Sequence, residues 1–152
     1  MLNYKRAIQM LQEPPPPALA ESSRHMEARE NLQRLVDMTR AYADQGLLMF
    51  VEFYNENIGH WGFVHPSASY EGKFRWTSFI EDGWWGHYDE FDSPEEAFFD
   101  MLYSGFDVME VGALQRAMKS PTWPKYKRNP WYPYPWNVNI HRRNPWLFHI
   151  SP

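Results

Sequence analysis

Three side chains that suit acid–base chemistry lie close together in the middle of the sequence: Ser78, His87 and Asp89. A histidine flanked by a carboxylate and a hydroxyl, beside Trp76 and Trp85, is an arrangement that general acid–base or nucleophilic catalysis can use. No oxyanion donor or nucleophile elbow accompanies these residues. We therefore treat them as weak catalytic candidates and favour a structural role for His87.

Metal and cofactor sites have less support. His60 and His65 are separated by an odd number of residues, so on one regular strand they face opposite sides. His87 with Asp89 has usable spacing, but two ligands do not make a metal site. The chain has no cysteine, no glycine-rich phosphate loop and no H-E-x-x-H motif. We predict no metal and no cofactor, and we favour a protein that is not an enzyme.

Charge is arranged in three blocks. Residues 1–75 hold 8 Lys or Arg against 9 Asp or Glu, residues 76–115 hold none against 10, and residues 116–152 hold 7 against none. Acids spaced along a hairpin and a helix can imitate a DNA backbone and occupy a cationic groove, although a solvated face is the simpler alternative. The predicted acidic surface consists of Glu81, Asp82, Asp89, Glu90, Asp92, Glu95, Glu96 and Asp100.

The last segment combines cations, aromatic rings and proline. Repeated prolines exclude a regular helix, so residues 120–152 are predicted to form an extended arm. Rings that stack on bases beside cations that neutralise phosphate suit single-stranded nucleic acid. The alternatives are an arm that packs on its own domain or one that docks on a partner, with Trp131, Trp136 and Trp146 as anchors. The predicted binding residues are Trp123, Tyr126, Arg128, Trp131, Tyr132, Trp136, Arg142, Arg143 and Trp146.

A β-hairpin is predicted around Asp82 and Gly83, which separate two runs rich in aromatic and β-branched residues. A two-residue type I′ turn at these positions fixes the register by arithmetic. The predicted pairs are Ile80 with Trp85, Ser78 with His87, Thr77 with Tyr88, Arg75 with Glu90 and Phe74 with Phe91.

A helix is predicted directly after the hairpin. Ser93 suits the N-cap, Pro94 the first helical position, and Glu96 the third position of a capping box. Gly105 is placed to end the helix. Its apolar stripe consists of Ala97, Phe98, Met101 and Leu102.

The remaining elements follow from apolar periodicity. Residues 2–12 predict a short helix with Leu2, Ile8 and Leu11 on one side. Residues 22–44 predict a long helix that ends at Gly46 and presents Leu32, Leu35, Val36, Thr39, Tyr42 and Ala43 on one face. The apolar run 47–54 predicts a covered strand, and residues 61–65 a shorter one. Residues 107–119 predict a helix with Val108, Val111, Leu114 and Met118 inward.

This order predicts an α+β fold: a four-stranded antiparallel β-meander flanked by helices, with an extended arm rich in Pro and Trp. We divide the chain into residues 1–17 (a short helix and a polyproline linker), 18–119 (a single domain) and 120–152 (the arm). No apolar run reaches the roughly 18 residues of a membrane span, and no secretory signal is evident, so we expect no membrane and a cytoplasmic location.

The leading functional hypothesis is a non-catalytic protein-interaction module that docks on a protein partner or on a second copy of itself. One version is a small phage or mobile-element protein that inhibits a host nucleic-acid-handling defence complex through its acids, in the host cytoplasm. The alternatives are single-stranded nucleic-acid binding through the arm, and a small hydrolase centred on His87.

Overall fold

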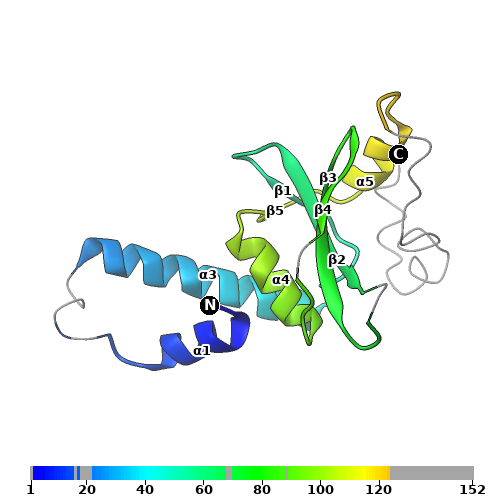
Figure 1. Cartoon of the computed structure of the whole chain (residues 1–152). Helices are drawn as coiled ribbons and strands as arrows, with labels where there is room; N and C mark the ends of the chain where they lie inside the picture. Colours follow the sequence, from blue (N-terminus) through cyan, green and yellow to red (C-terminus); the bar gives the residue numbers. More distant parts are fainter. Residues whose placement is uncertain (1, 16, 18–21, 68–69, 88, 124–152) are drawn as a thin grey trace.

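The computed structural model describes residues 2–15, 17, 22–67, 70–87 and 89–123, and for residues 84–87 it describes the backbone alone (Figure 1). The helices are α1 (Tyr4–Gln12), α3 (Ser23–Asp44), α4 (Pro94–Tyr103) and α5 (Ala113–Lys119). The strands are β1 (Phe53–Asn55), β2 (His60–Pro66), β3 (Phe74–Ile80), β4 (Gly83–His87) and β5 (Val108–Met109). Among these described residues no helix combines the length and the apolar character needed to cross a bilayer.

The strands form one antiparallel sheet with the order β4-β3-β2-β1-β5. Strands β1 to β4 are neighbours in the order of the sequence, so the predicted α+β fold with a four-stranded meander is confirmed. The two-residue strand β5 was not predicted. It extends the sheet beyond β1, where Met109 pairs with Phe53 and Val108 pairs with Tyr54.

Helices cover both faces of the sheet (Figure 1). On one face, Phe53, Val64 and Trp76 pack with residues of α3 and α4, and Ala7 of α1 is buried in the same core. On the other face, Phe63 and Phe79 pack with the buried residues of α5. This division follows from the alternation of side chains along β2 and β3.

The helix signals read from the sequence are largely confirmed. Ser22 caps α3 through a hydrogen bond from the His25 amide to its Oγ, 3.4 Å long. Ser93 caps α4 in the same way, with the Glu96 amide as donor at 3.2 Å. Gly105 follows α4 with a φ of 100°, a backbone conformation that favours glycine at a helix end.

Glu96 corrects one detail of the predicted capping box. Its carboxylate does not return to the amide of Ser93. Instead, Oε2 accepts a hydrogen bond from the Tyr4 amide (2.9 Å) and Oε1 accepts one from the Lys5 amide (3.2 Å). These amides belong to the first turn of α1, where unpaired N–H groups and the helix dipole attract an anion. Glu96 therefore fastens α1 to α4.

Replacing Glu96 with alanine should lower the free energy of unfolding by about 1–3 kcal/mol, because two amides of α1 lose a charged acceptor. Glu95→Ala is the matched control, since Glu95 also lies in the first turn of α4 but is half-buried. Urea denaturation measures both variants, and hydrogen exchange of the α1 amides locates the effect. Equal stability of the two variants would refute the fastening role.

The hairpin register differs from the prediction near the turn. Ile80 pairs with Gly83 and Phe79 with Trp84, so the turn residues are Glu81 and Asp82. Asp82 does not have the positive φ that a type I′ turn requires, whereas Gly83 has a φ of 123°. The register then shifts between Ser78 and Phe79. The predicted pairs of Ile80 with Trp85, Ser78 with His87 and Thr77 with Tyr88 are therefore wrong.

Towards the open end of the hairpin the chain regains the predicted register. Phe74 pairs with Phe91, as expected. Arg75 forms an ion pair with Glu90, which had been predicted to lie opposite it. Each extra residue in one strand shifts the β-ladder by one position. Such shifts explain why the predicted register fails near the turn and holds at Phe74.

The apolar run 47–54 is a strand only at its end. Leu47, Leu48 and Val51 are buried, but β1 begins at Phe53. Phe50 has a φ of 64°, which turns the chain, and its amide donates to the carbonyl oxygen of Val64 at 2.8 Å. Leu47, Leu48 and Val51 pack in the same core as residues of α3 and the sheet, and such burial does not require a β-ladder.

The helix predicted over residues 107–119 is also too long. Gly112 has a φ of 91°, and α5 begins only after it. Val108, predicted to face inward, lies in β5 with 39% of its surface exposed. Val111 and Leu114 do pack inward, whereas Met118 is 36% exposed. A left-handed glycine breaks the helical pattern, and the segment before it pairs with β1 instead.

Candidate functional site

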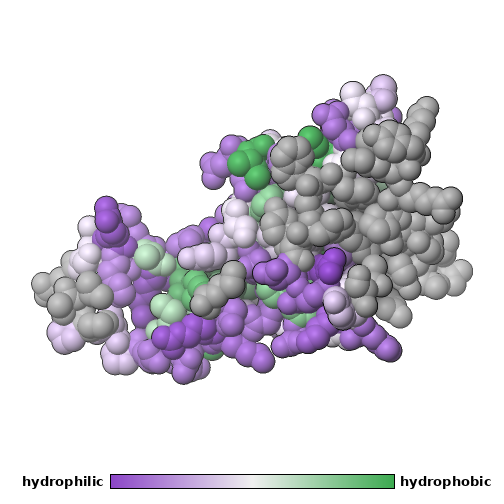
Figure 2. Space-filling model, viewed as in Figure 1, coloured by the Kyte–Doolittle hydropathy of each residue, from purple (hydrophilic) through white to green (hydrophobic). Residues whose placement is uncertain are grey.

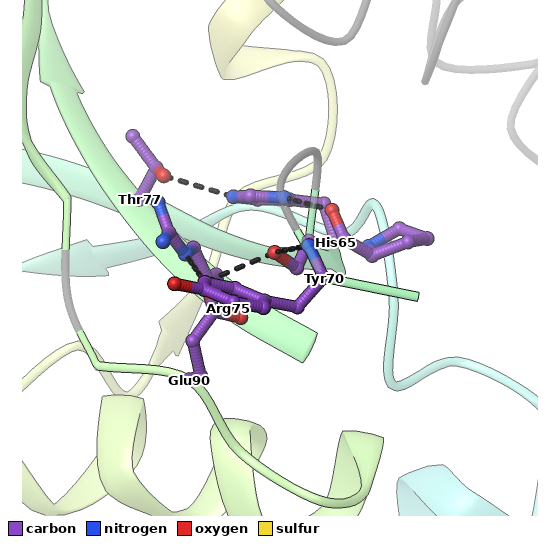
Figure 3. Close-up of polar contacts among 7 residues, drawn as sticks. His65, Tyr70, Arg75, Thr77 and Glu90 are labelled. Atoms are coloured by element: carbon purple, nitrogen blue, oxygen red, sulfur yellow. Dashed lines mark hydrogen bonds and ion pairs between the residues drawn. The ribbon is translucent and has the colours of Figure 1, made fainter. Parts of the chain in front are cut away.

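His65 of β2 and Thr77 of β3 form a buried polar pair on the sheet face covered by α5 (Figure 3). Neither side chain is exposed. The Nε2 of His65 lies 2.8 Å from the Oγ1 of Thr77, and its Nδ1 lies 2.8 Å from the carbonyl oxygen of Pro66. In the neutral ring Nδ1 carries the proton, because a carbonyl only accepts, so the Thr77 hydroxyl donates to Nε2. Both ring nitrogens are thus used in hydrogen bonds within the fold.

Glu90 lies at the centre of a second polar cluster beside this pair (Figure 3). Its Oε1 accepts hydrogen bonds from Nε of Arg75 and from Oγ of Ser67, the latter 3.0 Å long. The Tyr70 amide donates to the same Ser67 Oγ at 3.1 Å. These contacts join the β2–β3 loop to the segment that follows β4. Glu90 is thereby used to hold two segments together.

The catalytic candidates are not brought together as predicted. Ser78 pairs with Gly86, and Thr77 takes the place opposite His87. Ser78 is fully buried, and its Oγ has no hydrogen-bond partner among the described residues. The side chain of His87 lies outside the described part of the chain, and Asp89 is exposed. No group of three His, Asp or Glu side chains within the described ranges is arranged to hold a metal ion.

The predicted acidic surface divides into two groups. Glu90, Glu96 and Asp100 have partners inside the fold, and Asp100 accepts a 2.8 Å hydrogen bond from Nε1 of Trp76. Burial raises the pKa of Asp100 above its ordinary value. Glu95 is half-buried. The exposed acids are Glu81, Asp82, Asp89 and Asp92, and a hydrogen bond from Lys73 lowers the pKa of Asp92.

Of the nine arm residues predicted to bind a partner, Trp123 lies within the described part of the chain, and the other eight lie outside it. Trp123 is 7% exposed and packs with Phe63, Phe79, Leu114 and Ala117. Its amide donates to the carbonyl oxygen of Ser120 at 3.0 Å. Trp123 is therefore part of the core on the α5 face.

Glu52 is a buried acid that the sequence analysis did not single out. It is 5% exposed, and its Oε2 accepts a hydrogen bond from the Leu114 amide at 2.9 Å. Burial raises its pKa to about 7, although the amide hydrogen bonds and the positive charge of Arg116 act in the opposite direction. Gly112, at the N-cap of α5, supplies no side-chain cap. The carboxylate of Glu52, the residue before β1, therefore caps the N-terminus of α5.

A groove of about 370 Å³ lies between α1 and α3. The two helices run antiparallel (Figure 1), and Tyr103 at the end of α4 also lines the groove. Figure 2 shows green, apolar surface between α1 and α3 with purple, hydrophilic surface on either side. Its apolar lining comprises Leu2, Met10, Pro14, Pro15, Ala28, Leu32 and Tyr103, and its polar lining comprises Arg6, Glu13, His25, Arg29 and Asn31.

Arg29 holds the rim of the groove in place. Its guanidinium donates to the carbonyl oxygens of Met10 (3.2 Å), Leu11 (2.7 Å) and Glu13 (3.1 Å), which lie at the C-terminal end of α1. Helix C-termini leave carbonyls unpaired, so a cation is stabilising there. Sequence periodicity indicated the two helices, but nothing in it predicted that Arg29 would cap the other helix.

The chain matches no known protein family model, and no curated protein and no solved structure is significantly similar to it. Its function is therefore inferred from its own surface and charge.

Proposed function

We propose that the chain is a non-catalytic protein-interaction module that binds a segment of a partner protein in the groove between α1 and α3. The observation that carries this proposal is the groove itself, which has an apolar floor, a proline wall and a cationic rim. Ligand sites are typically concave and mostly apolar, with a few polar groups that fix orientation. The volume of about 370 Å³ suits a few side chains of a partner rather than a large ligand.

A rigid floor supports this reading. Leu32 at the base of the groove is 7% exposed, and the helices on either side are fixed by Arg29 and, at the other end of α1, by Glu96. Binding to a surface that is already ordered costs less conformational entropy than binding to a loose one. Tyr103, at the edge of the groove, is 52% exposed, and tyrosine is a common anchor in protein interfaces.

The polar clusters favour a non-catalytic role. The nitrogens of His65 and the carboxylate Oε1 of Glu90 are occupied by hydrogen bonds within the fold. Acid–base catalysis needs a group that can reach substrate. Single-stranded nucleic-acid binding through the arm and a hydrolase centred on His87 stay as predictions, because residues 124–152 and the side chain of His87 lie outside the described part of the chain.

Filling the groove should abolish docking. Ala28→Trp places an indole in the groove from α3 without changing the charge, because Ala28 is an exposed residue of its lining. Ala41→Trp is the matched control on an exposed position of the same helix outside the groove. Short random peptides selected by display on the natural chain should bind Ala28→Trp at least about tenfold more weakly, a loss of about 1.4 kcal/mol. Binding to Ala41→Trp should be unchanged.

Thermal denaturation of both variants must first show that each is folded. Selected peptides that bind the two variants equally well would contradict docking in this groove. A selection that yields no peptide dependent on Ala28 would contradict it as well.

A further inference from the structure

The groove between α1 and α3 has an electrostatic character that specifies its occupant. Two guanidinium groups, those of Arg6 and Arg29, line it together with the imidazole of His25. The one carboxylate in the lining, that of Glu13, lies 3.9 Å from Nη1 of Arg6, and both side chains are about half exposed. Such an exposed pair neutralises little charge. Two arginines against one glutamate therefore leave an excess of positive charge in the lining.

Arg29 is one of the two cations of this lining. Its three hydrogen-bond acceptors are backbone carbonyls, so its charge is oriented but not cancelled by a carboxylate. Arginine presents five donors in a fixed fork, and the bonds to Met10, Leu11 and Glu13 fix the direction of that fork. A cation that is held in place before binding recognises an anion with little loss of rotamer entropy.

His25 belongs to the same lining, and one of its ring nitrogens has no hydrogen-bond partner among the described residues. Its backbone amide is used at the start of α3, where it donates to Oγ of Ser22. Its Nε2 is covered from solvent and has no hydrogen-bond partner among the described residues. A covered polar atom without a partner carries a free-energy cost, which a ligand group can remove once the imidazole turns and exposes Nε2 to the groove.

We propose that the occupant of the groove is an acidic, amphipathic segment of a partner protein. Its Asp or Glu carboxylate lies among Arg6, Arg29 and His25, and its apolar side chains contact Leu2, Leu32 and Tyr103. This inference rests on the proposed docking function and specifies the chemistry of the partner. Charged residues of opposite sign on the two surfaces steer the encounter and exclude partners of the wrong charge.

The charge of the chain itself argues against an occupant from its own C-terminal arm. Residues 120–152 contain five Lys or Arg and no Asp or Glu, so the arm carries the same sign as the rim of the groove. On α4, Glu96 and Asp100 are no better candidates, because they have partners inside the fold. An acidic segment from another protein is the complementary occupant.

The test is a display selection of random peptides on the full chain, followed by binding measurements. Selected peptides should be enriched in Asp and Glu next to apolar residues, and their affinity should fall as salt is raised. Arg6→Gln should weaken binding about three- to fivefold, the range expected for one partly exposed charge pair. Arg24→Gln is the matched control, because Arg24 is an exposed residue of α3 outside the groove.

The outcomes separate this inference from the docking function. Peptides that lack acids but lose binding on Ala28→Trp would overturn the acidic occupant and leave docking intact. Peptides that are indifferent to Ala28→Trp would overturn both. Two further probes address occupants from the chain itself: a synthetic peptide of residues 124–152, and sedimentation of the full chain. Groove-dependent binding of that peptide, or a dimer that Ala28→Trp dissociates, would also overturn the proposal.

Discussion

Replacing Trp123 with alanine is expected to lower the free energy of unfolding by about 3–5 kcal/mol, the usual cost of removing a buried tryptophan. Trp123 is 7% exposed and packs between α5 and the sheet, against Phe63, Phe79 and Leu114. Its removal leaves a cavity where the two layers meet. The loss should appear as a lower midpoint in urea denaturation.

Met118→Ala is the control for this experiment. Met118 lies on α5 but is 36% exposed, so its truncation should cost well under 1 kcal/mol. If Trp123→Ala is no less stable than Met118→Ala, Trp123 does not belong to the core. The result matters for the arm, because Trp123 is the last described residue of that segment.

Replacing Glu52 with glutamine should remove a pH dependence of stability worth about 3 kcal/mol. Burial raises the pKa of Glu52 from 4.5 to about 7 in the folded chain, and each pKa unit corresponds to about 1.4 kcal/mol. Because the folded pKa is the higher one, the folded state holds the proton more tightly. Glu52 therefore contributes this stability fully below pH 4.5, and the contribution is lost as the pH rises through about 7.

Glutamine preserves an oxygen that can accept the hydrogen bond from the Leu114 amide, but it does not titrate. The quantity to measure is the difference in unfolding free energy between Glu52→Gln and the natural chain at several pH values. The difference should move by about 3 kcal/mol in favour of the variant from pH 4.5 to above 7. Using the difference cancels the contributions of Asp92 and Asp100, whose pKa values are also shifted. A difference that is constant with pH would contradict a raised pKa at Glu52.

Local signals in the sequence predicted much of the fold. Ser22 and Ser93 are N-caps, Gly46 and Gly105 have the positive φ typical of residues that follow helices, and the meander has its expected order. Each of these features depends on a few consecutive residues. Gly112 is a local signal of the same kind, and α5 begins directly after it.

Other features depend on contacts that no local pattern contains. Leu47, Leu48 and Val51 are buried as in a covered strand, but the run 47–51 has no ladder, because Phe50 turns the chain. Glu96 suited a local capping box, yet its carboxylate binds amides that lie more than 90 residues away in sequence. Glu52 was visible as a lone acid within an apolar run, which is a signal of a buried carboxylate.

The candidate site was the least predictable part. Some of the acids and rings singled out from the sequence have partners inside the fold, among them Glu96, Asp100 and Trp123. The groove between α1 and α3 arises only when two helices and the end of α4 meet. Arg6, Arg29 and His25 are separated along the chain, so their common position could not be read from spacing.

Chemical-shift mapping tests docking in the groove most directly. A display-selected acidic peptide is titrated into isotope-labelled full-length chain, and the backbone amide shifts are followed by nuclear magnetic resonance. We expect the changes to concentrate in α1, in the first half of α3 and around Tyr103, and to disappear in Ala28→Trp. Changes centred instead on the hairpin or on the α5 face, or retained in Ala28→Trp, would show that the groove is not where the partner binds.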